Sequence, residues 1–245
     1  KKDNLINKLF FIPTFFCFSN YEKKLFERTD AKINKFIPVG SLKASIFLKR
    51  LGEKKIMLNE NKYDICLIGE PASRTVNEFK DLDQYYEIPG KIAEFTLRLC
   101  KKNNLSLVFS GKSPELDFQH LEEKLYYKHF LKDIDFDILP RKNSFSTFEN
   151  AFQSKLIIGH NSTFLREISA VNKKVLNLNL SGHNDLKEPF SGIGYLEKFN
   201  YEAFEERVMK LLSMEYSDFQ NKLSLDNDYV VAKSDNAISN ILKEI

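Results

Sequence analysis

Residues 154–167 read Ser-Lys-Leu-Ile-Ile-Gly-His-Asn-Ser-Thr-Phe-Leu-Arg-Glu, an apolar run that leads through a short polar turn into a helical pattern. The run Lys155–Ile158 is apolar after its first residue, which is typical of a strand buried on both faces of a sheet. From Thr163 to Val171 the apolar residues fall three and four apart, as in an amphipathic helix. A buried strand followed at once by a helix predicts a parallel sheet covered by helices on both faces.

The same alternation continues on both sides of this stretch. The expected strands are Tyr63–Ile68, Leu105–Phe109, Asp135–Leu139, Lys155–Ile158 and Lys174–Leu178. The expected helices between them are Lys91–Lys102, Leu121–Leu131, Phe145–Gln153 and Thr163–Val171. The sequence therefore predicts a doubly wound, mainly parallel, Rossmann-like α/β domain.

Further elements flank this domain. Before it, strand-like runs at Ile6–Phe18 and Lys35–Val39 alternate with helical patterns at Tyr21–Arg28 and Leu42–Leu51. After it come expected helices at Tyr201–Met214, Asp218–Leu223 and Asp235–Ile245, with Ser217 and Ser234 as candidate N-caps. The polar stretch Glu53–Lys62 is the expected linker. We expect residues 1–57 to be the end of an amino-terminal α/β domain with its linker, and residues 58–245 to form one Rossmann-like domain with terminal helices. Because the sequence begins without Met, we also expect an amino-terminal portion to precede it.

The composition is that of an ordinary soluble globular protein, with 42% hydrophobic and 29% charged residues. Lysine and arginine number 37 against 34 acidic residues, which is too even to indicate a nucleic-acid partner. The three cysteines lie in separate apolar runs and are expected to be reduced core residues. No apolar stretch approaches the ~20 residues of a transmembrane helix. We expect a cytoplasmic protein, whose association with the inner face of the membrane would rest on modest basicity alone.

The loops after the expected strands form the candidate site, because open parallel sheets bind ligands beyond the carboxyl ends of their strands. These loops are residues 69–74, 110–113, 140–144, 159–163 and 181–185, and each combines small residues with hydrogen-bonding or charged ones. Together these loops would form a rim at one edge of the sheet, and such a rim suits an anion, for example a monophosphate or a diphosphate. Lys112 and Arg141 are candidates to neutralise the phosphate, or they are plain surface charges.

The loop after Lys155–Ile158 is the most specific of the five. Gly159 is expected to let the chain turn sharply out of the strand, and the free amides at the start of the next helix favour a phosphate. Two interpretations fit Ser162. It is a plain N-cap, or it forms a phosphate site together with Asn161 and Thr163.

Three other side chains also have two interpretations each. Glu167, on the helix after this loop, can accept a hydrogen bond from a ribose or sugar hydroxyl, or can pair with Lys173 or Lys174. His160 is a candidate phosphate ligand or catalytic acid, or a structural histidine at the end of a strand. Glu70 is a candidate carboxylate beside the transferred sugar, or the partner in a salt bridge to the preceding domain.

Several motifs are absent. The sequence contains no His-Glu-x-x-His, paired Cys-x-x-Cys or Gly-x-Ser-x-Gly pattern and no dinucleotide-binding Gly-x-Gly-x-x-Gly. The triplet Gly111-Lys112-Ser113 lacks the upstream glycine of a phosphate-binding loop. We therefore expect no bound metal and no cofactor, and the hydrolase, kinase and dehydrogenase classes are disfavoured.

Residues 63–71, 109–112 and 154–167, with 173–176 and 204–208, resemble the carboxyl-terminal half of bacterial surface-carbohydrate biosynthesis transferases with GT-B-like architecture. The resemblance runs from about Lys35 to the end. It implies two facing Rossmann-like domains, with the activated sugar held mainly by the second. The implied reaction is metal-independent transfer of a sugar from a nucleotide sugar to a surface glycan or a lipid-linked glycan. Helix starts similar to Ser162-Thr163 hold the donor phosphate in related transferases, although the usual pair there is Ser-Ser.

Two alternatives remain beside this glycosyltransferase. One is a nucleotide-sugar epimerase of the same architecture, and the other is a non-catalytic module that binds a nucleotide or a glycan. In GT-B enzymes the first domain usually supplies the acceptor site and the catalytic base. On the resemblance, residues 1–52 are expected to be only the final strands and helices of such a domain, and the chain by itself could be inactive.

Overall fold

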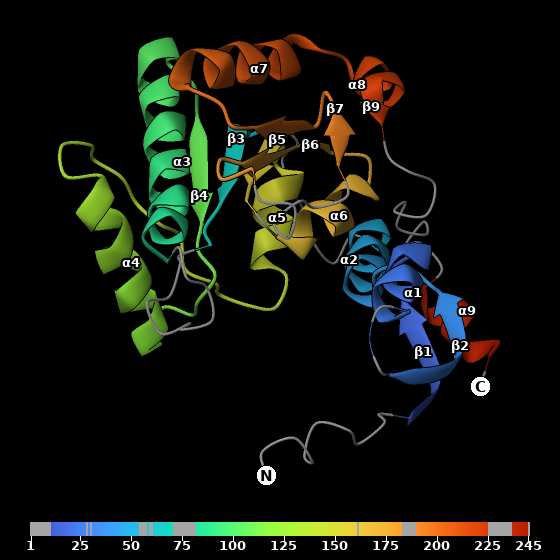
Figure 1. The fold of residues 1–245 in the computed structure, drawn as a ribbon. Coiled ribbons are helices and arrows are strands. Elements are labelled where there is room, and N and C mark those ends of the chain that lie inside the picture. Colours follow the sequence, from blue (N-terminus) through green and yellow to red (C-terminus); the bar gives the residue numbers. More distant parts are fainter. Residues whose placement is uncertain are drawn as a thin grey trace. The chain divides into compact units, whose positions relative to one another are not determined.

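The computed structural model describes residues 11–27, 29, 31–53, 58, 61–70, 82–160, 162–182, 190–224 and 237–244. The chain divides into two compact units (Figure 1). The larger unit is Met57–Ser224, and the smaller combines Lys1–Ile56 with Leu225–Ile245. The carboxyl-terminal residues thus group with the amino-terminal unit, whereas the sequence assigned them to the large domain.

A five-stranded parallel sheet forms the centre of the larger unit. Its strands are β3 (Tyr63–Ile68), β4 (Leu107–Ser110), β5 (Ser154–Gly159), β6 (Lys174–Asn179) and β8 (Tyr195–Glu197), in the order β4-β3-β5-β6-β8. Most side chains of β3, β5 and β6 are buried, as expected for parallel strands covered on both faces. The predicted α/β fold with a parallel sheet is confirmed.

Helices cover both faces of this sheet (Figure 1). Helix α3 (Leu82–Asn103) contacts α4 (Phe118–Phe130) and α7 (Tyr201–Ser213), whereas α5 (Ser146–Phe152) and α6 (Thr163–Ser169) pack on the strands from the other side. Helix α8 (Tyr216–Lys222) precedes β9 (Leu223–Ser224), which pairs antiparallel with β7 (Ser191–Gly192). Glu215 occupies the N-cap of α8. The prediction of Ser217 as this cap is therefore wrong, because Ser217 lies inside the helix.

The expected strand Asp135–Leu139 is reduced to a single β-bridge. Leu139 donates its N–H to the carbonyl of Phe109 and accepts the N–H of Gly111, which places it beside β4. With this bridge counted as a strand, the order across the sheet becomes 139-β4-β3-β5-β6-β8. That is the 3-2-1-4-5-6 order of the Rossmann fold.

Helix α3 begins at Leu82, before the expected start at Lys91, although Pro89 lies inside it. A proline normally interrupts a helix because it has no N–H to donate. Here the hydroxyl of Tyr126 accepts the N–H of Gly90 and donates to the carbonyl of Tyr86. A side chain of α4 thus completes the hydrogen bonding of the proline-containing turn.

Helix α4 turns polar side chains toward the sheet. His120, Glu123 and Tyr127 are buried, whereas Leu121 and Leu125 are 53% and 58% exposed. The leucine spacing predicted the helix correctly, but those leucines lie on its outer face. The inner face of α4 contacts the loops that follow β3 and β4.

The smaller unit is built on a parallel β-α-β motif. Strand β1 (Phe11–Cys17) pairs with β2 (Lys32–Pro38), and α1 (Asn20–Phe26) connects them; α2 (Leu42–Gly52) follows and contacts α9 (Ala237–Leu242). Ser19 and Glu22 form a capping box on α1. The rings of Phe15, Phe26 and Phe36 contact one another between α1 and the two strands.

The three cysteines, Cys17, Cys66 and Cys100, are buried and form no disulfide. Burial raises the pKa of the Cys100 thiol to about 12. Within the described ranges, no helix combines the length and the apolar character needed to cross a membrane.

Candidate functional site

The strand order creates a topological switch point between β3 and β5. The chain leaves β3 toward β4 on one side, and after the Leu139 bridge it crosses back to β5 on the other side. Open α/β sheets bind ligands in the crevice beyond the strands that flank such a point. Glu70 follows β3 and His160 follows β5. Two residues proposed from the sequence therefore lie on the two loops that flank the switch point.

Glu70 forms an ion pair with Lys112 from the neighbouring loop after β4. The distance from Glu70 Oε2 to Lys112 Nζ is 2.9 Å, and the two side chains are 25% and 64% exposed. The ion pair joins two predicted site residues within the larger unit, rather than joining Glu70 to the preceding domain. Because Lys112 is mostly exposed, its ammonium group is accessible to an anion at the rim.

Two buried side chains of α4 hold the backbone that carries this ion pair. The hydroxyl of Tyr127 accepts the N–H of Glu70 at 3.0 Å. The carboxylate of Glu123 accepts the N–H of Lys112, at 3.1 Å and 3.3 Å from its two oxygens. Both α4 side chains are only 1% exposed and lie one turn apart. The ends of β3 and β4 are thus fixed by one helix face.

Two glycines make room for the Glu123 carboxylate. A Cβ atom on Gly69 would lie 2.7 Å from Glu123 Oε1, and one on Gly111 would lie 2.9 Å from Oε2. Burial raises the pKa of Glu123, while its hydrogen bonds from Lys112, His120 and the Ser113 backbone oppose that shift. The carboxylate is therefore costly to bury and is stabilised by the loop that it holds.

His160 makes a hydrogen bond that defines its tautomer. Its Nδ1 lies 2.7 Å from the carbonyl oxygen of Leu178. A carbonyl can only accept, so Nδ1 carries the hydrogen and Nε2 holds the lone pair of the neutral ring. Burial lowers the pKa of His160, while the Leu178 hydrogen bond and the charge of Glu70 raise it. The neutral ring can accept a proton or a hydroxyl hydrogen bond at Nε2, but has no proton there to donate.

The turn into α6 differs in detail from expectation. Ser162 occupies the N-cap position with extended backbone, yet its hydroxyl makes no capping hydrogen bond. Thr163 begins the helix and is exposed, and Glu167 lies half-buried one turn later. Gly159 is not in the left-handed region. A Cβ there would approach the Leu165 methyl groups to 3.3 Å, so close packing, rather than a sharp turn, explains this glycine.

The other proposed residues lie farther from the switch point or outside the described residues. Arg141 follows the Leu139 bridge beyond β4, with an exposed side chain, and its N–H donates to the carbonyl of Ser113 at 2.9 Å. The ammonium of Lys174, a candidate partner of Glu167, instead donates to carbonyls at the end of α7. Asn161, residues 71–74 and residues 183–185 lie outside the described part of the chain.

The sequence interpretation missed Glu123 and Tyr127. With His120 they stand three and four residues apart, so the three polar side chains share one face of α4. That spacing was the available signal, although nothing in it shows that the face is buried. In the described residues, no group of three or more His, Cys, Asp or Glu side chains could hold a metal ion.

Comparisons with known proteins fit this architecture. A family model described as "putative O-antigen biosynthesis protein" matches residues 31–203. The structure is similar to the UDP-GlcNAc 2-epimerase of Methanocaldococcus jannaschii in complex with UDP-GlcNAc and UDP. The TM-score is 0.57 at 14% sequence identity, over 95% of this chain and 61% of the epimerase. At that identity, the likeness shows a shared fold.

The wall teichoic acid polymerase TagF is also similar, with a TM-score of 0.41 at 14% identity over 94% of this chain and 56% of the polymerase. The chain thus spans less than two thirds of the length of either solved protein. A search of the curated proteins gave no match.

Proposed function

The chain belongs to the O-antigen biosynthesis family whose model it matches, and we propose that it is the donor-binding part of a glycosyltransferase. The donor is a nucleotide sugar, and the acceptor is a surface polysaccharide or a lipid-linked glycan. The observation that carries the proposal is the charged rim at the switch point, where the Glu70–Lys112 ion pair lies beside His160. A donor bound there would lie where open α/β sheets hold their ligands.

In this proposal the donor phosphate binds Lys112. The ammonium group exchanges one anionic partner, the Glu70 carboxylate, for another. Arg141 extends the positive charge toward the outer edge of the rim. On the other side of the switch point, Ser162 and Thr163 bind the phosphate together with Asn161, which lies outside the described residues; the Ser162 hydroxyl is not used as a cap. Glu167 accepts a hydrogen bond from a ribose or sugar hydroxyl.

Glu70 and His160 act on the transferred sugar and its acceptor. When Lys112 engages the phosphate, the Glu70 carboxylate is released to take the proton of the acceptor hydroxyl. The acceptor oxygen forms the new glycosidic bond as the bond between the sugar carbon and the phosphate oxygen breaks. The departing nucleotide carries away that electron pair, and Lys112 stabilises its charge without a metal ion. His160 holds a sugar hydroxyl through Nε2.

Binding of UDP, CDP and CMP by isothermal titration tests the site. We expect Lys112→Ala to lower the affinity for the nucleotide about 10- to 100-fold, because a charge-assisted hydrogen bond contributes about 1.5–3 kcal/mol. Ser162→Ala combined with Thr163→Ala should abolish binding. Lys124→Ala, which removes an exposed lysine from α4, is the matched control. Unchanged affinity in both site variants would refute the site, and the absence of any nucleotide binding would favour a non-catalytic module.

A nucleotide-sugar epimerase of the same architecture is the second candidate, since the UDP-GlcNAc 2-epimerase of Methanocaldococcus jannaschii shares this fold. The two candidates differ in their need for an acceptor. Incubating the chain with UDP-GlcNAc alone discriminates between them. An epimerase inverts the configuration at one carbon of the sugar without an acceptor, whereas the transferase leaves the nucleotide sugar unchanged.

A further inference from the structure

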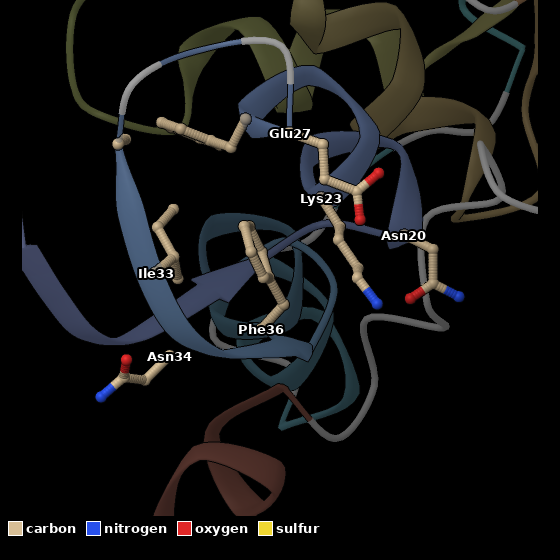
Figure 2. A pocket seen from close by; sticks show the side chains of 8 residues that line it. Asn20, Lys23, Glu27, Ile33, Asn34 and Phe36 are labelled. Carbon is tan, nitrogen blue, oxygen red and sulfur yellow. The ribbon is translucent and has the colours of Figure 1, made fainter.

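A pocket lies in the smaller unit, between α1 and β2 (Figure 2). Its volume is about 320 Å³. The apolar part of its lining comes from Phe26, Ala31, Ile33 and Phe36, and the polar part from Asn20, Lys23, Glu27 and Asn34. One wall is therefore aromatic and aliphatic, and the rest carries amides and one charge of each sign.

The four polar side chains of this pocket have no hydrogen bond or ion pair with any residue that the structure describes. Lys23 and Glu27 stand one turn apart on α1, a spacing at which ion pairs often form. They form none here, although the same helix uses Glu22 in its capping box. All four side chains are exposed, so their polar groups are accessible to a ligand.

The chemistry of the lining selects among ligand classes. A carboxylate next to an ammonium gives no excess positive charge, which disfavours a phosphate. Asn20 and Asn34 can each donate and accept, which matches adjacent hydroxyl groups. The negative faces of aromatic rings attract the C–H groups that cover one side of a sugar ring. A volume near the lower end of the ~300–1,000 Å³ range of ligand pockets suits a small ligand rather than a nucleotide sugar.

We propose that this pocket binds a monosaccharide unit of a glycan, separately from the donor site. The ring stacks against the Phe26 and Phe36 side, and its hydroxyls bind Asn20 and Asn34, with Lys23 and Glu27 as a further donor and acceptor. The inference deepens the proposed function and rests on it for the identity of the glycan as a surface polysaccharide. It assigns glycan recognition to the smaller unit.

Saturation-transfer NMR on the intact chain tests the inference, with glucose, galactose and N-acetylglucosamine as probes. We expect at least one sugar to bind with millimolar affinity, and Asn20→Ala combined with Asn34→Ala to weaken it at least tenfold. Both asparagines are exposed, so this variant should fold. Phe36→Leu, which removes the ring but keeps an apolar side chain, should also weaken binding. Asn221→Ala, which changes an exposed asparagine of α8, is the control and should bind as the wild type does.

Equal sugar binding by the wild type and the double asparagine variant would overturn the inference. Displacement of the sugar by uridine or cytidine would overturn it too, because the pocket would then be a nucleoside site. Titration with UDP in parallel separates this inference from the proposed function. If the chain binds UDP but no sugar, only the inference is overturned. If it binds a sugar that the pocket variants no longer bind, and binds no nucleotide, the inference is supported and the donor site is overturned.

Discussion

The rim of the larger unit and the pocket of the smaller unit both present charged side chains, but they are built in opposite ways. At the rim, Lys112 is paired with Glu70, and Glu123 and Tyr127 bind the backbone of both residues. Around the pocket, the polar side chains have no partner among the described residues. The rim is therefore ordered before a ligand arrives, whereas the pocket must order its side chains on binding.

This difference predicts which substitutions change the stability of the protein and which change its affinity for a ligand. Ordering one long side chain on binding costs about 0.5–1.5 kcal/mol, so a pocket of free side chains binds its ligand more weakly than a prepared one. In a preorganised site the cost is instead part of the free energy of folding, here the cost of burying the Glu123 carboxylate. Substitutions in the buried support of the rim should therefore change the free energy of unfolding, whereas those of the four exposed polar side chains around the pocket should change ligand affinity alone.

The largest effect is expected from Glu123→Ala. The substitution removes the acceptor of the Lys112 and Ser113 N–H groups and leaves a cavity, which should lower the free energy of unfolding of the larger unit by about 2–4 kcal/mol. Urea denaturation measures this change. The exposed neighbour Glu122→Ala should stay within about 0.5 kcal/mol of the wild type. A wild-type midpoint for Glu123→Ala would show that the carboxylate does not support the rim.

Gly111→Ala should have the next largest effect. Its Cβ would lie 2.9 Å from both Glu123 Oε2 and Ile138 Cγ2 and 3.0 Å from the carbonyl oxygen of Leu139, so we expect a loss of about 1–3 kcal/mol. Gly52→Ala in the smaller unit is the matched control, because a Cβ there meets nothing within 4 Å. At the end of α2 it should be neutral or stabilise by up to about 1 kcal/mol. Equal losses in the two variants would contradict tight packing at the rim.

Sequence patterns were enough to predict the sheet, but not all of its edges. Strands β3, β5 and β6 are apolar runs whose burial on both faces makes them recognisable. Strand β8 has only three residues and no such run, and it was missed. The run Asp135–Leu139 looked like a strand, but only Leu139 is hydrogen-bonded to β4. The sequence patterns did not predict the strand order, so the switch point between β3 and β5 became visible only in the structure.

The support of the site was beyond sequence patterns for a different reason. The inner face of α4 is defined by its contacts with two loops: Tyr127 binds the backbone of Glu70, 57 residues away in sequence, and Glu123 binds that of Lys112 in the loop before the helix. Leu121 and Leu125 satisfy a helical period whichever side faces the sheet, so the period cannot identify the buried face. The sequence therefore indicated the loops that carry Glu70 and Lys112, but neither their ion pair nor the helix that holds them.

His160 provides a smaller, pH-dependent effect at the rim. Burial lowers the pKa of His160 below its ordinary value of 6.5, so the unfolded chain binds the proton more readily than the folded one. Stability should therefore be complete above pH 6.5 and should decrease as the pH falls from there toward the lowered pKa. His160→Asn retains a donor for the Leu178 carbonyl but cannot be protonated. Urea denaturation from pH 7.5 to pH 5 should show a shallower decrease for this variant, and parallel curves would refute the assignment of a buried neutral ring.

The smallest effect is expected in the pocket. Lys23→Ala and Glu27→Ala should each leave the free energy of unfolding within about 0.5 kcal/mol of the wild type, because both side chains are exposed and neither has a partner to lose among the described residues. Glu22→Ala on the same helix is the control, since it breaks the capping box with Ser19 and should cost about 0.5–2 kcal/mol. Thermal and urea unfolding of the three variants measure the difference. If Glu27→Ala destabilised the chain as much as Glu22→Ala does, its carboxylate would have a structural role. The contrast between a prepared rim and an open pocket would then not hold.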